Sequence, residues 1–163
     1  MPTLQKSIRR ARPLLGTLVE IRVDNADEAC AVSAIDAAFA EIAAVHRLMT
    51  FHAHDSDITR SNREAARDAV AVDARTRDVL SLAIEFARAS GGGFDPTIAA
   101  ELVAWNFLPR PCGARAPDPT AHWRDIEILA DGRIRCAKPL WIDLGGIAKG
   151  YAVYRAIESL RDS

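Results

Sequence analysis

The sequence predicts an α+β protein in which an antiparallel sheet packs against helices. Apolar side chains recur at helical spacing in some segments and alternate with polar ones in others, and these segments occur in blocks without strict β-α-β order. The dipeptide Asp131-Gly132 between two apolar runs is a strong hairpin signal, which favours antiparallel pairing. With 163 residues, of which 49% are hydrophobic, the chain is long enough for one core, so we expect a single domain over residues 1–163.

The charge balance and the cysteines exclude several classes of protein. The 21 basic and 22 acidic residues give a net charge of -1, so no overall field favours nucleic acid or an anionic membrane. Cys30, Cys112 and Cys136 are odd in number, widely spaced and without a Cys-x-x-Cys pair, which argues against a disulfide framework or a zinc site. No apolar stretch has the length of a signal peptide core or a membrane span. We therefore expect reduced thiols, a cytoplasmic location and no membrane span.

A strand followed by a long helix is predicted at the beginning of the chain. Thr17 to Val23 alternates apolar and polar side chains, which is typical of a half-buried strand. Asn25 followed by Glu28 resembles a capping box in front of an alanine-rich segment. We expect a helix that ends near residue 49 and buries large apolar side chains at helical spacing, namely Ile35, Phe39, Ile42 and Met49.

The middle of the chain predicts a functional loop and two further helices. Thr50 to Arg63 is rich in Asp, Ser and Asn, so we interpret it as a structured loop that carries function. Thr76 is a candidate cap for the next helix, and Gly91 is well placed just after its end. Ile98 to Phe107 predicts a short helix that carries Trp105. The expected buried stripe of the helix after Thr76 consists of Val79, Leu80, Ala83, Ile84, Phe86 and Ala87.

The last third of the chain predicts a surface loop, a hairpin and a strand that leads into a helix. Residues 109–120 contain four prolines and a glycine, as expected for a surface loop without regular structure. Ile126 to Leu129 and Arg133 to Cys136 are the predicted hairpin strands. Leu140 to Leu144 predicts a third apolar strand, followed by a Gly145-Gly146 turn. The final helix is expected to bury Val153, Ile157 and Leu160, and the tryptophans Trp105, Trp123 and Trp141 are expected to be packing residues.

The Gly145-Gly146 turn is the strongest local candidate for ligand binding. Glycines let backbone N–H groups approach a ligand closely, and the N-terminus of the following helix favours anions such as a diphosphate. The residues do not match a Walker loop, because Lys149 precedes Gly150 instead of following it, and they lack the Gly-x-Gly-x-x-Gly spacing of a Rossmann fold. A tight strand-to-helix turn without a ligand explains the glycines equally well.

Five motifs in order along the chain resemble one known family. The sequence is similar to the ApbE family of FAD:protein FMN transferases from residue 12 onward. The departures are Asn106, at a position where members usually have glycine, and Tyr154, where they commonly have aspartate. The motifs that carry the resemblance are Met49-Thr50-Phe51-His52, Asp55-Ser56-Asp57-Ile58, Arg60-Ser61-Asn62, Gly93-Phe94-Asp95-Pro96-Thr97 and Asp143-Leu144-Gly145-Gly146-Ile147-Ala148-Lys149-Gly150-Tyr151-Ala152.

The resemblance implies a T-fold-like, ApbE-like architecture and a metal-dependent flavin transfer. Members of this family split FAD with a divalent metal, usually Mg²⁺, attach FMN to a Ser or Thr hydroxyl of an acceptor protein and release AMP. By resemblance, the backbone carbonyl of Ala148 is a metal ligand, and Lys149 lies near the phosphates together with the amides of Gly145 and Gly146. The resemblance implies an acceptor protein with a Ser or Thr flavinylation site as the partner. Apolar faces that the later half of the family would cover favour self-association, so a homo-oligomer is a further expectation.

Other residues of the resembling motifs are candidate flavin contacts, each with a structural alternative. Met49 and His52 flank a ring system, or they are the end of the core stripe and a polar loop residue. Asp57 and Asn62 bind the ligand by hydrogen bonds, or they fix their own loop. The remaining three candidates are Asp95 and Thr97, which shape the pocket wall, and Asp143, which faces the pocket or caps the turn.

Family members are considerably longer than this chain. Their later half supplies an Asp and a Thr as metal ligands and a histidine proposed as the base, so we expect the catalytic base outside residues 1–163, which then form a truncated ApbE-like domain. A backbone carbonyl alone does not hold Mg²⁺, which requires several oxygen ligands. The alternatives to a transferase are a non-catalytic flavin- or nucleotide-binding module and a structural remnant that self-associates.

Overall fold

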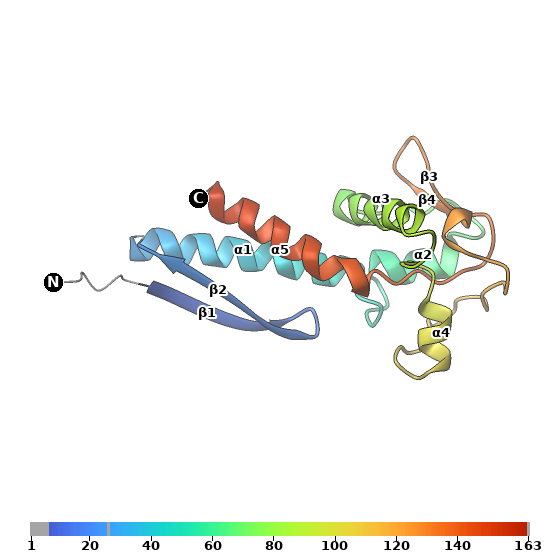
Figure 1. Ribbon diagram of the computed structural model, residues 1–163, viewed down its shortest axis with the longest axis horizontal. Helices are drawn as coiled ribbons and strands as arrows, with labels where there is room; N and C mark the ends of the chain where they lie inside the picture. The colour runs from blue at the N-terminus through green and yellow to red at the C-terminus, as the bar shows by residue number, and fades with distance from the viewer. Residues whose placement is uncertain (1–6, 26, 163) are drawn as a thin grey trace. The chain divides into compact units, whose positions relative to one another are not determined.

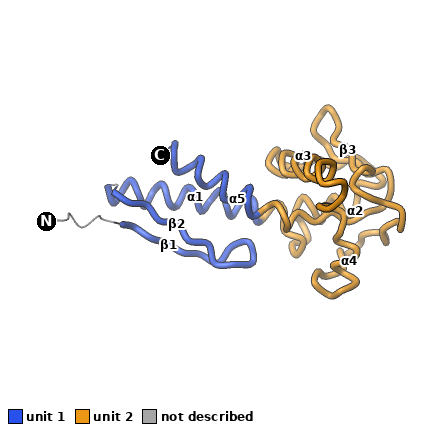
Figure 2. The backbone as a smooth tube through the Cα atoms, viewed as in Figure 1, with its two compact units in different colours: residues 1–46, 149–163 blue, residues 47–148 orange. Residues whose placement is uncertain are grey.

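The computed structural model describes residues 7–25 and 27–162 and confirms the α+β class. Its contacts divide the chain into two compact units: the first unit comprises the described parts of 1–46 and 149–163, and the second unit comprises 47–148 (Figure 2). The elements in Figure 1 are β1 (Ser7–Leu14), β2 (Thr17–Asp24), α1 (Glu28–Met49), α2 (Asp57–Glu64), α3 (Ala74–Ala89), α4 (Ala99–Ala104), the 3-10 helix η1 (Trp123–Asp125), β3 (Ile126–Ile128), β4 (Ile134–Cys136) and α5 (Gly145–Arg161). The expectation of a single domain stays a prediction.

In the first unit, β1 and β2 form an antiparallel ribbon. Their register runs from Ser7 opposite Asp24 to Leu14 opposite Thr17. Leu15 and Gly16 connect the strands, and both have positive φ angles, 55° and 70°, as tight hairpin turns require. The prediction of a strand after Thr17 is confirmed, whereas its partner β1 was not predicted.

The long helix α1 forms as predicted, but a different residue caps it. Asn25 has a φ of 61°, a left-handed conformation that N-cap residues do not use. The carboxylate of Asp27 instead accepts hydrogen bonds from the N–H groups of Ala29 and Cys30, at 3.0 and 3.2 Å. The capping box predicted at Asn25 is therefore wrong. The predicted apolar residues of the helix are all buried, namely Ile35, Phe39, Ile42 and Met49.

The sequence of α1 passes a simple test for a membrane span, contrary to the expectation that no segment does. Its 22 residues include a window with a mean hydropathy of 1.5, of which 39% is buried. The core helix of a globular protein passes the same test. Ile35, Phe39, Ile42 and Val45 are at most 1% exposed, so one face of α1 packs inside the protein.

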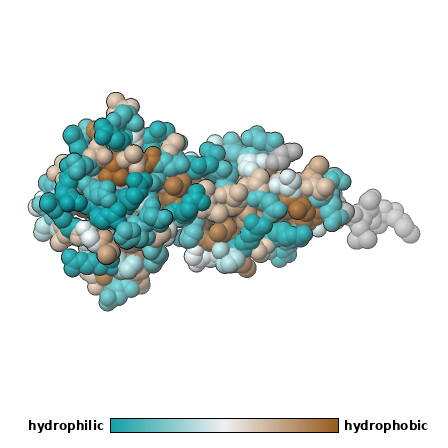
Figure 3. Space-filling view, turned by 180° about the vertical axis from the view of Figure 1, so that it is seen from behind, coloured by the Kyte–Doolittle hydropathy of each residue, from teal (hydrophilic) through white to brown (hydrophobic). Residues whose placement is uncertain are grey.

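The buried face of α5 differs from the predicted one. Val153 and Ile157 are 50% and 43% exposed, whereas Ala152 and Ala156 are buried. Small side chains let a helix approach its neighbour closely, and an ion pair of 3.4 Å joins Arg155 to Glu41 of α1. Hydrophobic residues of α5 are consequently left exposed. On the face opposite to that of Figure 1, Figure 3 shows brown hydrophobic areas among teal hydrophilic ones.

In the second unit, part of the predicted functional loop is helical. The segment from residue 50 to 63 contains most of α2, whose N-cap Ser56 accepts a hydrogen bond from the N–H of Thr59 at 3.0 Å. The cap of α3 is Asp73, which accepts from the N–H of Arg75, and not the predicted Thr76, which lies inside the helix. A polar residue before the first apolar position is an ambiguous signal when several occur in a row.

The end of α3 agrees with the prediction. Gly91 has a φ of 62°, and the N–H of Gly92 donates to the carbonyl of Ala87 at 2.8 Å, which closes a Schellman motif. The predicted stripe is confirmed at Val79, where the side chain is fully buried, but Phe86 is 54% exposed. Its ring makes an edge contact with the Phe94 ring, with centroids 6.4 Å apart, so Phe86 packs at the surface.

The short helix α4 ends at a residue that explains one departure in the sequence. Asn106 adopts a φ of 59°, and the N–H of Phe107 donates to the carbonyl of Leu102 at 2.8 Å. Asparagine tolerates this left-handed conformation better than other residues with a side chain, so it replaces a glycine here. Trp123 and Trp141 are buried as predicted, whereas Trp105 is 61% exposed, contrary to its expected packing role.

The hairpin forms as predicted, but the strand predicted after it, from Leu140 to Leu144, does not form. β3 and β4 pair antiparallel, and Gly132 in their turn has a φ of 83°. Segment 109–120 contains no helix or strand, as expected for the proline-rich loop. Leu140 to Leu144 is not a strand, although four of its five side chains are buried.

Candidate functional site

A side-chain amide takes the place of a neighbouring strand beside Leu140 to Leu144. Asn62 of α2 accepts a hydrogen bond from the N–H of Ile142 at 2.6 Å, and it donates one to the carbonyl of the same residue at 3.0 Å. The N–H of Asp143 donates to the carbonyl of Pro96 at 2.9 Å. These contacts satisfy the buried backbone without a sheet, which is why the predicted third strand is absent from this segment.

The predicted glycine turn is the first turn of α5. The carbonyl of Leu144 accepts hydrogen bonds from the N–H groups of Ile147 and Ala148, at 3.0 and 2.8 Å. A Cβ at Gly145 would lie 3.0 Å from Oδ2 of Asp143, and a Cβ at Gly146 would lie 3.2 Å from Cε2 of Phe94. Neither glycine has a positive φ, so space rather than backbone conformation limits a side chain at both positions, where Asp143 or Phe94 would have to give way by a few tenths of an ångström.

Three of the sequence motifs meet at this point of the second unit. Asn62 holds Ile142, the Pro96 carbonyl binds Asp143, and the Phe94 ring touches Gly146. We call this group the glycine site, and it consists of Asn62, Phe94, Pro96, Asp143, Gly145 and Gly146. Both glycines are exposed at the N-terminal end of α5. An anion is favoured there by the helix dipole, while the Asp143 carboxylate opposes a second negative charge.

Asp95 and Thr97 form a turn next to the glycine site. Oδ1 of Asp95 accepts hydrogen bonds from the N–H and the hydroxyl of Thr97, at 2.8 and 2.7 Å. This turn holds Pro96 in place, and Pro96 in turn accepts the hydrogen bond from Asp143. Both predicted residues therefore support the wall beside the glycines.

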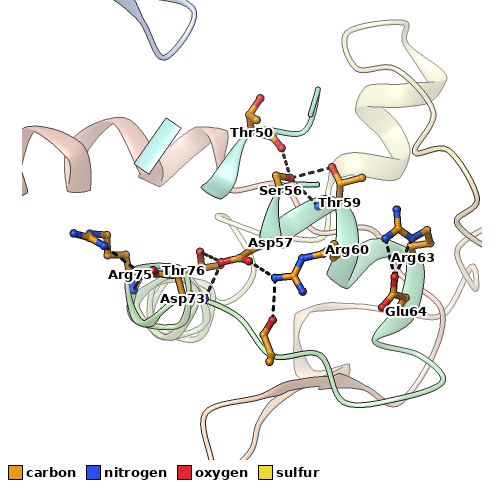
Figure 4. A network of polar contacts seen from close by, with 11 residues as sticks. Thr50, Ser56, Asp57, Thr59, Arg60, Arg63, Glu64, Asp73, Arg75 and Thr76 are labelled. Carbon is orange, nitrogen blue, oxygen red and sulfur yellow. Dashed lines mark hydrogen bonds and ion pairs between the residues drawn. The ribbon is translucent and has the colours of Figure 1, made fainter. Parts of the chain in front are cut away.

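The side chain of Asp57 makes contacts that hold the protein's own backbone and side chains in place (Figure 4). Its Oδ2 accepts hydrogen bonds from the N–H of Asp73 at 2.9 Å and from the hydroxyl of Thr76 at 2.7 Å, and its Oδ1 pairs with Arg60. Arg60 also donates to the carbonyl of Ala71 at 3.0 Å. With Asp57 only 4% exposed, this network fixes α2 to the start of α3 and favours the structural alternative for Asp57.

Met49 and His52 do not form one exposed pair. Met49 is 4% exposed at the end of α1, whereas His52 is exposed and its N–H donates to the hydroxyl of Thr50 at 3.2 Å. The burial of Met49 favours its alternative as the end of the core stripe. Its contact with a flavin ring stays a prediction, as does that of His52.

Comparison with known proteins identifies the family. A family model described as "ApbE family" matches residues 15–163. The chain belongs to the ApbE family. A curated "FAD:protein FMN transferase" of Treponema pallidum (strain Nichols) is 29% identical over 168 residues, which are 93% of this chain and 46% of that protein. The chain thus spans about half the length of the curated relative that it matches.

Solved structures of ApbE proteins share the fold. The ApbE protein of Thermotoga maritima superimposes with a TM-score of 0.83 at 25% identity, over 96% of this chain and 53% of that one. The flavinyl transferase ApbE of Pseudomonas stutzeri, in its apo form, gives a TM-score of 0.81 at 23% identity, over 99% and 54%. The ApbE architecture predicted from the motifs is therefore confirmed.

The described part of this ApbE chain does not form a magnesium site by itself. It holds no cluster of three or more His, Cys, Asp or Glu side chains that suits a metal. The carbonyl of Ala148, the metal ligand implied by resemblance, belongs to the first turn of α5, where carbonyls accept the helical hydrogen bond from four residues on. Mg²⁺ requires several oxygen ligands in octahedral geometry, and one carbonyl does not provide them.

Sequence reasoning missed some residues that shape this ApbE site. Pro96 contributes through its carbonyl, which accepts the hydrogen bond from the N–H of Asp143 at 2.9 Å. Backbone acceptors have no sequence signal. The contact between Phe94 and Gly146 was signalled only by the occurrence of both motifs in one chain.

Proposed function

We propose that this chain supplies the FAD-binding half of an enzyme that transfers FMN from FAD to a Ser or Thr hydroxyl of an acceptor protein, with release of AMP and with Mg²⁺. The family match over residues 15–163 carries the proposal. The relative from Treponema pallidum bears the name of this activity. Free thiols at Cys30, Cys112 and Cys136 support the cytoplasmic location that we propose with it.

In this proposal the glycine site binds the diphosphate of FAD. The N–H groups of Gly145 and Gly146 face the phosphates, and Lys149, four residues after Gly145 on α5, adds a positive charge. Asp95 and Thr97 form the wall beside them. Asn62 and Asp57 act indirectly, because they hold the surrounding backbone.

The transfer itself balances as a phosphoryl substitution. The acceptor hydroxyl oxygen attacks the phosphorus of the FMN moiety, the bond to the bridging oxygen breaks, and AMP leaves. The hydroxyl proton passes to a base that we do not place among residues 1–163. Mg²⁺ remains part of the proposal only, and no step is assigned to it, because the described residues do not form its site.

The test incubates the purified chain with FAD, Mg²⁺ and a peptide that contains Ser and Thr. Because we do not place the base among residues 1–163, we expect this chain to bind FAD; AMP release and a mass gain of one FMN group on the peptide would show that it also completes the transfer. No AMP at any protein concentration would contradict catalysis by this chain alone. Flavin that stays bound after desalting, without turnover, would favour the non-catalytic binding module.

A lysine variant tests the location of the phosphates. Lys149→Ala is expected to weaken FAD binding about tenfold, because a charge-assisted contact is lost. Lys138→Ala is the matched control, since its amine instead contacts the Thr120 carbonyl and hydroxyl, at 3.3 and 3.0 Å. Titration of flavin fluorescence measures both affinities. Equal affinities for wild type and Lys149→Ala would remove Lys149 from the site.

A further inference from the structure

A cavity of about 400 Å³ lies in the second unit, outside the glycine site. It is bounded by the start of α4, the end of the proline-rich loop and the extended segment after β4. Its apolar lining includes Ile98, Leu140 and Trp141, and its polar lining includes Asp95, Glu101 and Asp118. This combination suits a ligand with an apolar stem and a polar head.

Two identical tripeptides place carboxylates at this cavity. Asp95-Pro96-Thr97 and Asp118-Pro119-Thr120 adopt the same turn. In the second turn, Oδ1 of Asp118 accepts from the N–H and the hydroxyl of Thr120, both at 2.7 Å, as Asp95 does from Thr97. Among the described residues, the second oxygen of each carboxylate makes no hydrogen bond, so both remain available to a donor.

The cavity lining is negatively charged. Glu101 adds a third carboxylate, and no Lys or Arg belongs to the lining within the described ranges. The hydrogen bonds from Thr120, and then the nearby charge of Lys138, hold the pKa of Asp118 below its usual value, so this carboxylate is ionised at neutral pH. A phosphate is disfavoured in such surroundings, whereas a cation is favoured.

Trp141 gives the cavity a rigid aromatic wall. Its side chain is buried, and the hydrogen bond from Nε1 to the carbonyl of Arg115 fixes the ring. A guanidinium group stacks on aromatic rings, loses its hydration more readily than an ammonium group, and binds carboxylates through several N–H donors. Its aliphatic stem is compatible with the side chains of Ile98 and Leu140.

From these features we infer that the cavity is a binding site for a guanidinium group on an aliphatic stem. The group belongs either to an arginine side chain of a protein partner or to a free guanidino compound. The cavity shares Asp95 and Thr97 with the wall beside the glycine site, whereas Glu101, Asp118 and Trp141 belong to the cavity and to no part of the proposed flavin site.

The test uses the full chain and an NMR titration of its three tryptophan N–H groups. The probe is N-acetyl-arginine methylamide, and its uncharged isostere N-acetyl-citrulline methylamide is the control. We expect a saturable shift of the Trp141 resonance with the arginine probe and at least a tenfold weaker effect with citrulline. The exposed Trp105 serves as the internal reference, and the loss of one resonance in Trp141→Phe identifies the signal.

Carboxylate variants test the head group contacts. Asp118→Asn keeps an oxygen that accepts from Thr120, and Glu101 is exposed, so Asp118→Asn and Glu101→Gln are both expected to fold. Each should weaken binding of the arginine probe about threefold to tenfold. Glu127→Gln changes the charge equally at an exposed ion pair with Arg135 and should leave binding unchanged.

A binding measurement with a peptide distinguishes the two sources of the guanidinium group. An arginine-containing peptide that binds more tightly than the free probe indicates a protein partner, whereas equal affinity indicates a free guanidino compound. The inference is overturned if the Trp141 resonance does not move, if citrulline binds as well as arginine, or if both carboxylate variants bind like wild type.

Discussion

The two units differ in how their interiors are held together. In the second unit, polar side chains are buried and hydrogen-bonded between segments that are distant in sequence, as Asn62 and Asp57 illustrate. In the described part of the first unit, the buried side chains are apolar, and the ion pair of Arg9 with Glu20 is exposed, whereas that of Arg155 with Glu41 is half-buried. Large apolar side chains, among them Leu18 at 69% exposure, also reach its surface.

This difference indicates which substitutions each unit tolerates. A unit with little sheet requires polar side chains to satisfy its buried backbone, so the loss of one such side chain leaves several groups without partners. A unit that relies on a strand ribbon and helix packing loses little when a surface ion pair is removed. The following substitutions test this contrast.

The largest effect is expected for Asp57→Ala in the second unit. The change leaves the Asp73 N–H, the Thr76 hydroxyl and the Arg60 charge without their partner, so the free energy of unfolding should fall by about 3 kcal/mol. Urea unfolding measures it. Asp36→Ala in the first unit is the control, because the exposed pair with Arg12 contributes at most about 1 kcal/mol. Equal losses in both variants would refute the contrast.

Asn62→Ala should cost about 2 kcal/mol, because the buried N–H and carbonyl of Ile142 lose their partner. Hydrogen exchange of the Ile142 amide should become faster, which locates the effect in the extended segment. Asn106→Gly is the matched control, since glycine also adopts the positive φ of this position and stability should not fall. Unchanged protection of Ile142 would show that the amide pair is not needed.

Cys136 in the second unit and Cys30 in the first allow the pH dependence of stability to be compared between the two units. Burial, followed by the nearby charge of Asp125, raises the pKa of Cys136 from 9.0 to about 12. Because the unfolded thiol loses its proton first, stability is unaffected below pH 9 and should fall by about 1 kcal/mol by pH 10. Cys136→Ala should abolish this part of the pH dependence, whereas Cys30→Ala, at an exposed site, should not. Thiol labelling at pH 8 should modify Cys30 and spare Cys136.

The smallest effect is expected for Arg12→Lys in the first unit. The Arg12 guanidinium lies 4.4 Å from the centre of the Phe39 ring, and it pairs with Asp36 at 2.6 Å. Lysine keeps the charge but loses the planar stacking group, so the cost should be about 0.5 kcal/mol. Thermal unfolding at low and high salt measures it. A loss as large as that of Asp57→Ala would mean that the first unit also depends on polar contacts.

Local signals predicted those elements whose structure is determined locally. The alternation in Thr17 to Val23, the turn at Gly132 and the end of α3 at Gly91 all depend on neighbours in the sequence. The segment from Leu140 to Leu144 has the composition of a strand, but its partner is the Asn62 side chain, which periodicity does not reveal. The prediction of the buried face of α5 was wrong, because a close approach between helices selects the small side chains of Ala152 and Ala156 over larger ones.

The candidate site was predicted in part. Family motifs indicated that Asn62, Asp95 and Asp143 belong together, and the structure places their segments in contact. The same motifs did not distinguish a residue that faces a ligand from one that holds the backbone, since a carboxylate such as Asp57 serves either purpose. The cavity at Trp141 had no sequence signal, because its two Asp-Pro-Thr turns are brought together only by folding.

The amide pair of Asn62 with Ile142 also bears on the order of folding. It joins residues 80 positions apart, so the intervening chain must be closed before the contact contributes. Helices α2 and α3 and the β3–β4 hairpin form from local contacts and can precede it. We therefore expect the extended segment to dock late, so that Asn62→Ala accelerates unfolding and hardly changes the rate of folding.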